Sequence, residues 1–418
     1  MKLYVPVLRN FSSRIYFPSL LIAATIMLLG TQSAGSTPCH ATEDPAWELM
    51  PTGTNASLRG LFVLDENVVW ASGTNGTLVS SSDQGRTWRL QVIPGAEALD
   101  IRDLHVFDAK NILAMTSGTP ARLYRSADAG LSWRMVFESN DPQVFLDSVS
   151  FLDPANGLVM GDPVDGRLFL LHSQDAGWTW TLVPDAPELE PGEAGFAASG
   201  TNMTTIGGTR WAIALGGGLR QTDTARNNAS DASEERSNSN SNSDSDSDSS
   251  AERTGERRGQ AQTPVSRIVT VDRDLREWQI SDTPIKRHES AGIFSLVFVD
   301  SLTGIAVGGD YKQPELAAEH LAVTQDGGAT WSVPKAGPTP SGFRSCVAVG
   351  RRGTGQPSLI AVGTHGTDLS WDLGQTWQRV SDLGFNAVQF SENGQVGWAA
   401  GSNGRVARWR TPSEPESK

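Results

Sequence analysis

Five copies of one short motif carry the most regularly spaced acidic side chains of the chain. Each copy reads Ser/Thr-x-Asp-x-Gly-x-Ser/Thr-Trp; the aspartates are Asp83, Asp128, Asp175, Asp326 and Asp372, and the tryptophans are Trp88, Trp133, Trp180, Trp331 and Trp377. Such a carboxylate could bind a metal ion or a substrate, or it could accept hydrogen bonds from the backbone of its own turn, where the glycine permits a positive φ. Because carboxylates in separate repeats cannot converge on one ligand, we interpret the five motifs as structural turns rather than as a metal site.

Three arginines share a second local pattern. Arg59, Arg102 and Arg344 each occupy the second position of a short segment that we expect to be an inner strand, in the contexts LRGL, IRDL and FRSC. Arginines gathered at one opening would suit a carboxylate or a peptide C-terminus, because the guanidinium donates two parallel hydrogen bonds. Alternatively, each arginine pairs with a neighbouring acid such as Asp103 or Asp147. The sequence leaves both readings open.

Further polar side chains fall in loops that we expect on the same face as these arginines. They are Asp162, Arg167, Asp310, Tyr311, Lys312 and His365. Loops held by a rigid scaffold often carry binding residues, so these side chains are candidates for contact with a partner. Turn formation alone would also explain Asp162, which precedes a proline.

A repeat of about 45 residues positions these groups. Each motif tryptophan opens a short apolar strand, and three more strands precede the motif within each period, separated by turn residues. Four short strands per period are typical of a propeller blade. We therefore predict an all-β fold, a seven-bladed β-propeller of four-stranded antiparallel blades over residues 45–410. The inner strands of blades two to seven are expected to start near Ile101, Leu146, Phe196, Ile293, Phe343 and Asn386.

The last repeat stops one strand short. Its first three strands lie in the segments NAVQF, VGWAAG and RVARW, after which the chain ends. The segment that begins at Trp47 resembles the missing outer strand. We expect it to pair with residues 405–409 and so to close the ring, which removes an open sheet edge.

Three segments lie outside this repeat. Residues 1–35 have basic residues, an apolar run and then small residues, which predicts a signal peptide; an uncleaved anchor is the alternative. Residues 221–263 are rich in Ser, Asn and Asp and are expected to be a disordered insert within blade four. Residues 411–418 are expected to form a flexible tail. The mature protein is thus expected to be exported, with no direct membrane span after cleavage.

The composition argues against several classes of function. The net charge of -13 gives no electrostatic basis for nucleic-acid binding. Two cysteines exclude a disulfide framework, and six scattered histidines show no metal-binding spacing, so we expect no cofactor and no metal.

The five motifs resemble the Asp-box, or bacterial neuraminidase repeat. Over 45–410 the chain also resembles the photosystem II stability/assembly factor family. The residues that carry this second resemblance are residues 70–88 (WASGTNGTLVSSSDQGRTW), Gly-Ile-Phe-Ser at 292–295 with Gly-Gly-Asp-Tyr at 308–311, and Gly-Trp-Ala-Ala-Gly-Ser-Asn-Gly at 397–404. The resemblance implies a binding scaffold that helps to assemble a membrane protein complex in a lumen. We expect a monomer that binds a protein partner, such as a membrane-complex subunit or a peptide carboxylate, in the periplasm, the extracellular space or a lumen. The serine-rich insert departs from the usual pattern of that family.

A sialidase-like glycoside hydrolase is the alternative function. Such an enzyme needs an arginine cluster, a tyrosine activated by a glutamate, and an acidic proton donor. Tyr311, with Glu315 close in sequence, is the candidate on the expected ligand face. We favour the non-catalytic scaffold, because a fold does not imply an activity.

Overall fold

The computed structural model describes residues 44–218, 264–335, 337–353 and 355–411. The predicted signal peptide, the predicted insert and residues 412–418 of the predicted tail lie outside these ranges. Within them all regular structure is β, as predicted, and none of these residues belongs to a helix that could span a membrane.

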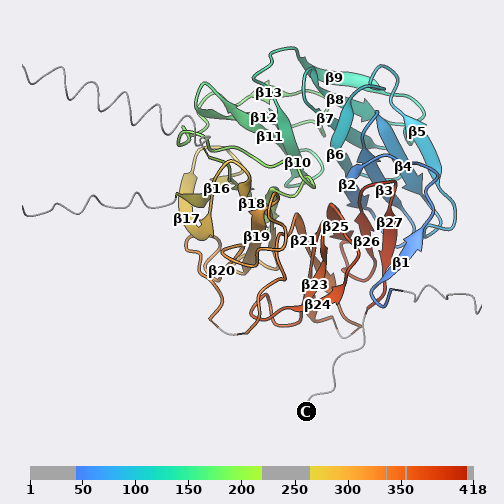
Figure 1. The fold of residues 1–418 in the computed structure, drawn as a ribbon. Coiled ribbons are helices and arrows are strands. Elements are labelled where there is room, and N and C mark those ends of the chain that lie inside the picture. Colours follow the sequence, from blue (N-terminus) through green and yellow to red (C-terminus); the bar gives the residue numbers. More distant parts are fainter. Residues whose placement is uncertain (1–43, 219–263, 336, 354, 412–418) are drawn as a thin grey trace, which may run out of the picture. The chain divides into compact units, whose positions relative to one another are not determined.

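Twenty-seven strands form seven antiparallel sheets that are arranged around a central axis (Figure 1). The strands are β1 (Trp47–Met50), β2 (Leu58–Val63), β3 (Val69–Gly73), β4 (Thr77–Ser81), β5 (Arg89–Val92), β6 (Asp100–Val106), β7 (Ile112–Ser117), β8 (Ala121–Ser126), β9 (Arg134–Ser139), β10 (Leu146–Phe151), β11 (Gly157–Val164), β12 (Arg167–Ser173), β13 (Thr181–Leu182), β14 (Met203–Ile206), β15 (Arg210–Ala214), β16 (Val265–Asp272), β17 (Trp278–Lys286), β18 (Ala291–Phe298), β19 (Gly304–Asp310), β20 (Leu321–Thr324), β21 (Cys346–Arg351), β22 (Pro357–Gly363), β23 (Gly366–Ser370), β24 (Gln378–Ser381), β25 (Ala387–Phe390), β26 (Gly397–Ala400) and β27 (Val406–Trp409).

Consecutive strands pair within each blade, so each blade is a meander. Blades one to four are β2–β5, β6–β9, β10–β13 and β14–β17; blades five and six are β18–β20 and β21–β24. The seven-bladed propeller predicted from the repeat is therefore confirmed. Blade five has three regular strands, because only the single bridge between Val323 and Ser332 stands in place of a fourth.

Blade seven combines the two ends of the described chain. Its sheet order is β1-β27-β26-β25, and β1 pairs with β27 in a register that sets Trp47 opposite Trp409. Figure 1 shows β1 beside β27. The indole of Trp47 is buried and meets the ring of Trp409 edge-on, with 4.9 Å between ring centroids.

Tryptophans fill the spaces between neighbouring blades. Trp70 on β3 packs in one buried cluster with Ile101 and Tyr124 of blade two. Trp398 on β26 meets Trp88 of blade one edge-on at 5.8 Å. Large aromatic surfaces thus join each sheet to the next, which accounts for the many tryptophans of the sequence.

The five aspartate motifs form nearly identical turns after the third strand of their blades. In the first, Ser81 Oγ donates to Asp83 Oδ1 at 2.8 Å and accepts the Gly85 amide at 2.8 Å. Thr87 donates to Asp83 from both its amide, at 2.9 Å, and its hydroxyl, at 2.6 Å. The same side-chain pattern recurs at Asp128, Asp175, Asp326 and Asp372.

Candidate functional site

The path of the strands divides the ring into two faces. Inner strands begin at the face that carries the blade-to-blade connections and the loops between second and third strands; we call it the upper face. They end at the lower face, which also carries the aspartate turns. The aspartates are held by their own turns, so they do not gather into one site.

A β-bulge near the start of four inner strands places one extra residue at the upper end of the channel. The register shifts fall between Leu58 and Gly60, Ile101 and Asp103, Leu146 and Ser148, and Ile293 and Ser295. The extra residues are Arg59, Arg102, Asp147 and Phe294. A bulge of this kind redirects a side chain away from the alternation of the strand, which is how propellers can present residues at a channel opening.

Arg59 and Arg102 are the two cations of this set. Arg102 pairs with Asp100 at 2.9 Å and also donates to the carbonyl oxygen of Ala197. Arg59 makes no hydrogen bond or ion pair with the described residues, and burial together with the nearby Arg102 charge lowers its pKa. Among the described residues only the charges of Asp100 and Arg102 act on Arg59, so its guanidinium donors are not used by any described side chain.

Arg344 departs from the expected cluster. Its side chain is fully buried; its Nε donates to Asp368 at 2.7 Å and its Nη2 is in direct contact with the same carboxylate. Its remaining donors reach the carbonyl of Phe343 and the hydroxyl of Ser341. Local pairing, the second of the two readings left open by the sequence, thus describes Arg344, and this arginine is not part of a surface cluster.

A buried acid pair lies beside Arg102. The carboxylate of Asp147 is buried, and neither of its oxygens has a hydrogen-bond partner among the described residues. Burial raises the pKa of Asp147 well above its usual range, and the neighbouring Asp162 raises it further. Burial likewise raises the pKa of Asp162 to about 6, although its Oδ1 accepts the Gly195 amide at 3.2 Å.

Residues 195–201, which we call the strap, cross the upper end of the channel. Their contacts reach four other blades: Gly195 bonds Asp162 of blade three, Ala197 bonds Arg102 of blade two, Ser199 Oγ donates to the Ser345 carbonyl at 2.9 Å, and Thr201 Oγ1 donates to Ser295 Oγ at 2.7 Å. The sequence predicts that the inner strand of blade four starts near Phe196. The strand starts at Met203 instead, after the strap.

Glycines allow the strap to lie directly on buried acids. A Cβ at Gly195 would lie 2.4 Å from Asp147 Oδ2, and one at Gly200, which has a φ of +73°, would lie 2.3 Å from Asp103 Cγ. Neither position has room for a larger residue.

Aromatic rings continue the upper surface toward blade five. Phe196 of the strap stacks on Phe294 with 4.0 Å between centroids, and Tyr311 meets both rings edge-on at 6.5 and 6.2 Å. Tyr311 is 47% exposed, and Lys312 Nζ lies 6.0 Å from its ring centroid. No carboxylate of the described residues hydrogen-bonds the Tyr311 hydroxyl.

The other loop candidates are engaged with neighbouring groups. Asp310 accepts hydrogen bonds from the Ser290 hydroxyl at 2.7 Å and the Lys312 amide at 2.9 Å. Arg167 pairs with Glu188 at 2.8 Å, and the exposed His365 is 2.9 Å from the Thr364 hydroxyl. Of the loop residues predicted from the sequence, Tyr311 and Lys312 join the aromatic surface.

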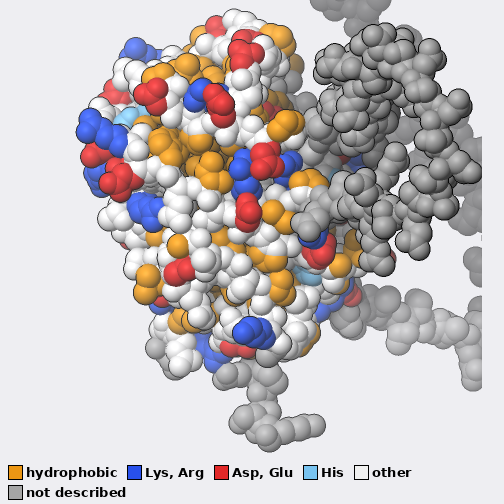
Figure 2. Space-filling model, turned by 90° about the vertical axis from the view of Figure 1, so that its left-hand side faces the viewer, with side chains coloured by type: hydrophobic (Ala, Val, Ile, Leu, Met, Phe, Trp, Pro, Cys, Tyr) orange, Lys and Arg blue, Asp and Glu red, His pale blue; other side chains and the backbone are white. Residues whose placement is uncertain are grey.

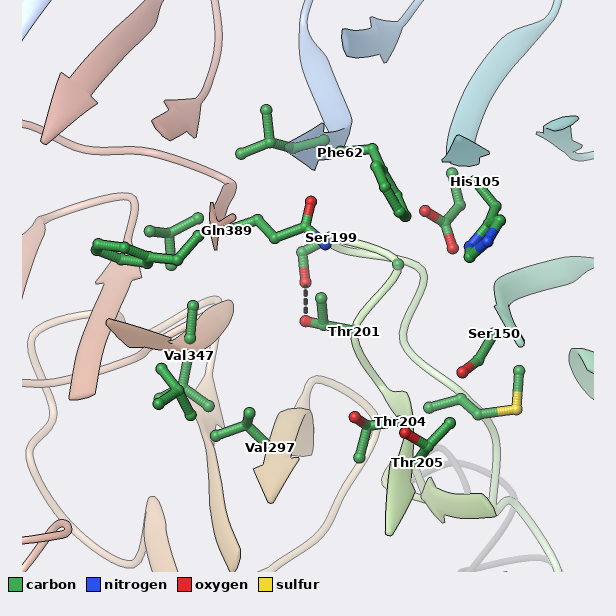
Figure 3. Close-up of a pocket in the computed structure, with 18 of the residues that line it drawn as sticks. Phe62, His105, Ser150, Ser199, Thr201, Thr204, Thr205, Val297, Val347 and Gln389 are labelled. Atoms are coloured by element: carbon green, nitrogen blue, oxygen red, sulfur yellow. Dashed lines mark hydrogen bonds between the residues drawn. The ribbon is translucent and has the colours of Figure 1, made fainter. Parts of the chain in front are cut away.

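The lower half of the channel holds a cavity of about 370 Å³. Figure 3 shows Phe62, His105, Ser150, Thr204, Thr205 and Gln389 around it, with Ser199 and Thr201 of the strap among them. Residues of all seven inner segments line the cavity. Sequence reasoning placed ligands on the upper face and missed this cavity, although its lining lies at the predictable ends of the inner strands.

Charge is mixed on the side of the ring that Figure 2 displays. Figure 2 shows acidic, basic and apolar side chains interspersed on the face that it displays, rather than one field of a single sign. Within the described ranges, no group of three or more His, Cys, Asp or Glu residues is arranged to hold a metal ion.

Comparison with known proteins identifies similar structures but no similar sequences. No protein-family model matches the chain, and none of the curated proteins matches it. The structure of YCF48 bound to a D1 peptide has a TM-score of 0.56 and 14% identity, over 88% of this chain and 98% of that one. The structure of YCF48 from Cyanidioschyzon merolae has a TM-score of 0.56 and 16% sequence identity, over 87% of this chain and 99% of that one. The structure of the Neurospora crassa Pan2 WD40 domain has a TM-score of 0.54 and 12% sequence identity, over 89% of this chain and 98% of that one. Identities this low establish a shared fold and nothing further.

Proposed function

We propose that the protein is an exported, non-catalytic scaffold that binds a protein partner on its upper face. The partner is a subunit of a membrane complex or another protein that offers a peptide carboxylate. The signal-peptide pattern of residues 1–35 supports export, and the sequence resemblance to photosystem II stability/assembly factors supports an assembly role. The fold that the chain shares with a structure of YCF48 bound to a D1 peptide is consistent with peptide binding.

One observation carries the proposal: the strap bonds Arg102, which lies near Arg59, and its Phe196 meets the half-exposed Tyr311. Arg59 lies near Arg102, Arg102 bonds the carbonyl of Ala197, and the adjacent Phe196 stacks between blades four and five beside Tyr311. Tyrosine and arginine are the residues that most often dominate the energy of protein interfaces. A peptide laid across this surface would place its carboxylate at Arg59 and an apolar side chain against Phe196 and Tyr311.

Crosslinking followed by mass spectrometry tests the proposal. The mature protein is used as bait in exported and membrane fractions, beside an Arg59→Ala/Tyr311→Ala variant and a Leu302→Ala control. Leu302 is 57% exposed and lies on the lower face, in the turn between β18 and β19. We expect the partner to crosslink to the upper face, to be lost with the double variant and to be retained with the control. Equal capture by all three proteins would contradict the proposal.

A further inference from the structure

We propose that the lower half of the central channel is a second binding site, which takes a neutral, polyhydroxylated ligand of mono- to disaccharide size. This site opens on the face opposite to the surface proposed for the protein partner. Its volume of about 370 Å³ falls within the range of about 300–1,000 Å³ that is usual for small-molecule sites. Ser199, Gly200 and Thr201 of the strap line its upper end, so we expect the ligand to enter from the lower face.

The lining of the cavity selects against charged ligands. None of the described residues that line it is Lys or Arg. Asp103 accepts the amides of Leu104 and Val149, both at 2.8 Å, and burial raises its pKa well above its usual range. Burial and the Arg125 charge lower the pKa of His105 to about 3, so its imidazole is neutral. A charged ligand would lose its hydration there without gaining a counter-ion. Glu392, the remaining acid of the lining, is exposed at the rim.

Free polar groups of the lining match a ligand rich in hydroxyl groups. The hydroxyls of Ser150, Thr204 and Thr205 make no hydrogen bond with the described residues. Gln389 Oε1 accepts the Val63 amide at 2.8 Å, which fixes the side-chain amide and leaves its Nε2 donor free. Hydroxyl groups and a neutral imidazole each donate and accept, as ligand hydroxyls also do. A purely apolar ligand would leave these groups without partners, which is costly.

Aromatic rings supply the apolar part of the same wall. The ring of Phe62 meets His105 edge-on at 4.8 Å, and Phe151 lies 4.5 Å from His105. Phe298 and Phe390 line the cavity from blades five and seven. Rings next to hydroxyl and amide groups suit a molecule with one polar edge and a face of C–H groups, such as a sugar ring.

Calorimetric titration of the mature protein tests the site. The neutral probes are glucose, maltose, N-acetylglucosamine and diacetylchitobiose; the charged probes are glucuronate and N-acetylneuraminate. A Thr204→Val/Thr205→Val variant removes two hydroxyls at nearly constant volume, and Ser150→Ala removes a third. Ser301→Ala, on the exposed lower turn of blade five, is the matched control.

We expect at least one neutral probe to bind, with affinity reduced about tenfold by the double valine variant and unchanged by the control. Absence of binding by every neutral probe at about 10 mM would overturn the proposal. Binding that the valine variant leaves unchanged, or equal binding of a charged probe, would overturn it as well.

A second measurement guards against a folding defect in the variants. The imidazole resonances of His105 in the unmodified protein are assigned by comparison with His105→Gln. We expect these resonances to shift on addition of the neutral probe that binds. If the probe binds while they stay in place, its site lies elsewhere and the proposal is wrong.

Discussion

The indole nitrogen of Trp47 donates a hydrogen bond to Thr367 Oγ1 at 3.0 Å. Since Thr367 lies on β23 of blade six, the first strand is attached to a neighbouring blade as well as to β27. The rings of Trp47 and Phe385 are 5.0 Å apart between centroids, and Phe385 belongs to the segment that connects blade six to blade seven. One buried side chain therefore contacts both blades and the segment that connects them.

This role predicts a large loss of stability on truncation of the side chain. Trp47→Ala should lower the free energy of unfolding by about 3–5 kcal/mol, because a buried aromatic ring and a hydrogen bond are lost together. Leu49→Ala on the same strand, where the side chain is 55% exposed, should change it by less than about 0.5 kcal/mol. Urea denaturation followed by tryptophan fluorescence measures both. Similar small effects for the two variants would mean that β1 contributes little to the ring.

The acid pair beneath the strap predicts a stability that falls as the pH rises. The folded-state pKa values of Asp147 and Asp162 are raised, the latter to about 6, above an unfolded value of about 4. As the pH rises, the unfolded chain therefore releases these protons at a lower pH than the folded protein does. The free energy of unfolding falls from about pH 4 upward, through the folded-state pKa values.

Asp147→Asn should remove part of this dependence. The stability of the variant relative to that of the unmodified protein should increase as the pH rises from about 4 to about 8. Asp165→Asn, in the exposed loop after β11, serves as the control substitution. Thermal unfolding across the pH range gives the comparison. A constant difference between Asp147→Asn and the unmodified protein would contradict ionisation as the cause.

The aspartate turns predict the opposite dependence at lower pH. Hydrogen bonds from Thr87 and Ser132 lower the pKa values of Asp83 and Asp128 to about 2. Their stabilising effect is present above an unfolded pKa of about 4 and is lost as the pH falls toward 2. In Thr87→Val, carbon-13 NMR titration should show the pKa of Asp83 moving back toward its usual value. The pKa of Asp128 should not move, which makes the second turn an internal control.

The upper face predicts selectivity for a free carboxylate. Once a partner peptide is identified, amidation of its C-terminus should weaken binding about tenfold, because a charged hydrogen bond to Arg59 would be lost. Arg59→Ala should weaken the acid form and leave the amide form nearly unchanged. Fluorescence anisotropy with both peptides measures the coupling. Additive effects of the two changes would show that Arg59 does not contact the carboxylate.

Most of the fold could be predicted from the sequence because the repeat is local. The motif ending at Trp88 and its copies mark the same turn in blade after blade, so the number of blades and the strand order follow from counting. The irregular parts depend on contacts between distant residues. Blade four begins at Met203, and the preceding Phe196 stacks on Phe294 of the neighbouring blade five; no pattern around Phe196 indicates that contact.

The candidate site was harder to predict for the same reason. Arg59 and Arg102 share the second position of an inner strand, where the structure has a bulge, but the same position holds Asp147 and Phe294 in other blades, which an arginine pattern cannot find. Arg344 shares the pattern and is nevertheless buried against Asp368, a partner from the third strand of its blade. Composition also gave no hint that neutral side chains would gather at the lower end of the channel.

Because blade seven takes β1 from the start of the described chain and β25, β26 and β27 from its end, the ring cannot close until all seven repeats have been synthesised. Trp47 is synthesised before the seven repeats, whereas its pairing partner Trp409 lies at the end of the seventh. Until then β1 has an unpaired edge, which would attract other chains. Rapid completion of the polypeptide, or a chaperone that covers its leading segment, should therefore matter more for this protein than for one whose sheets each come from continuous sequence.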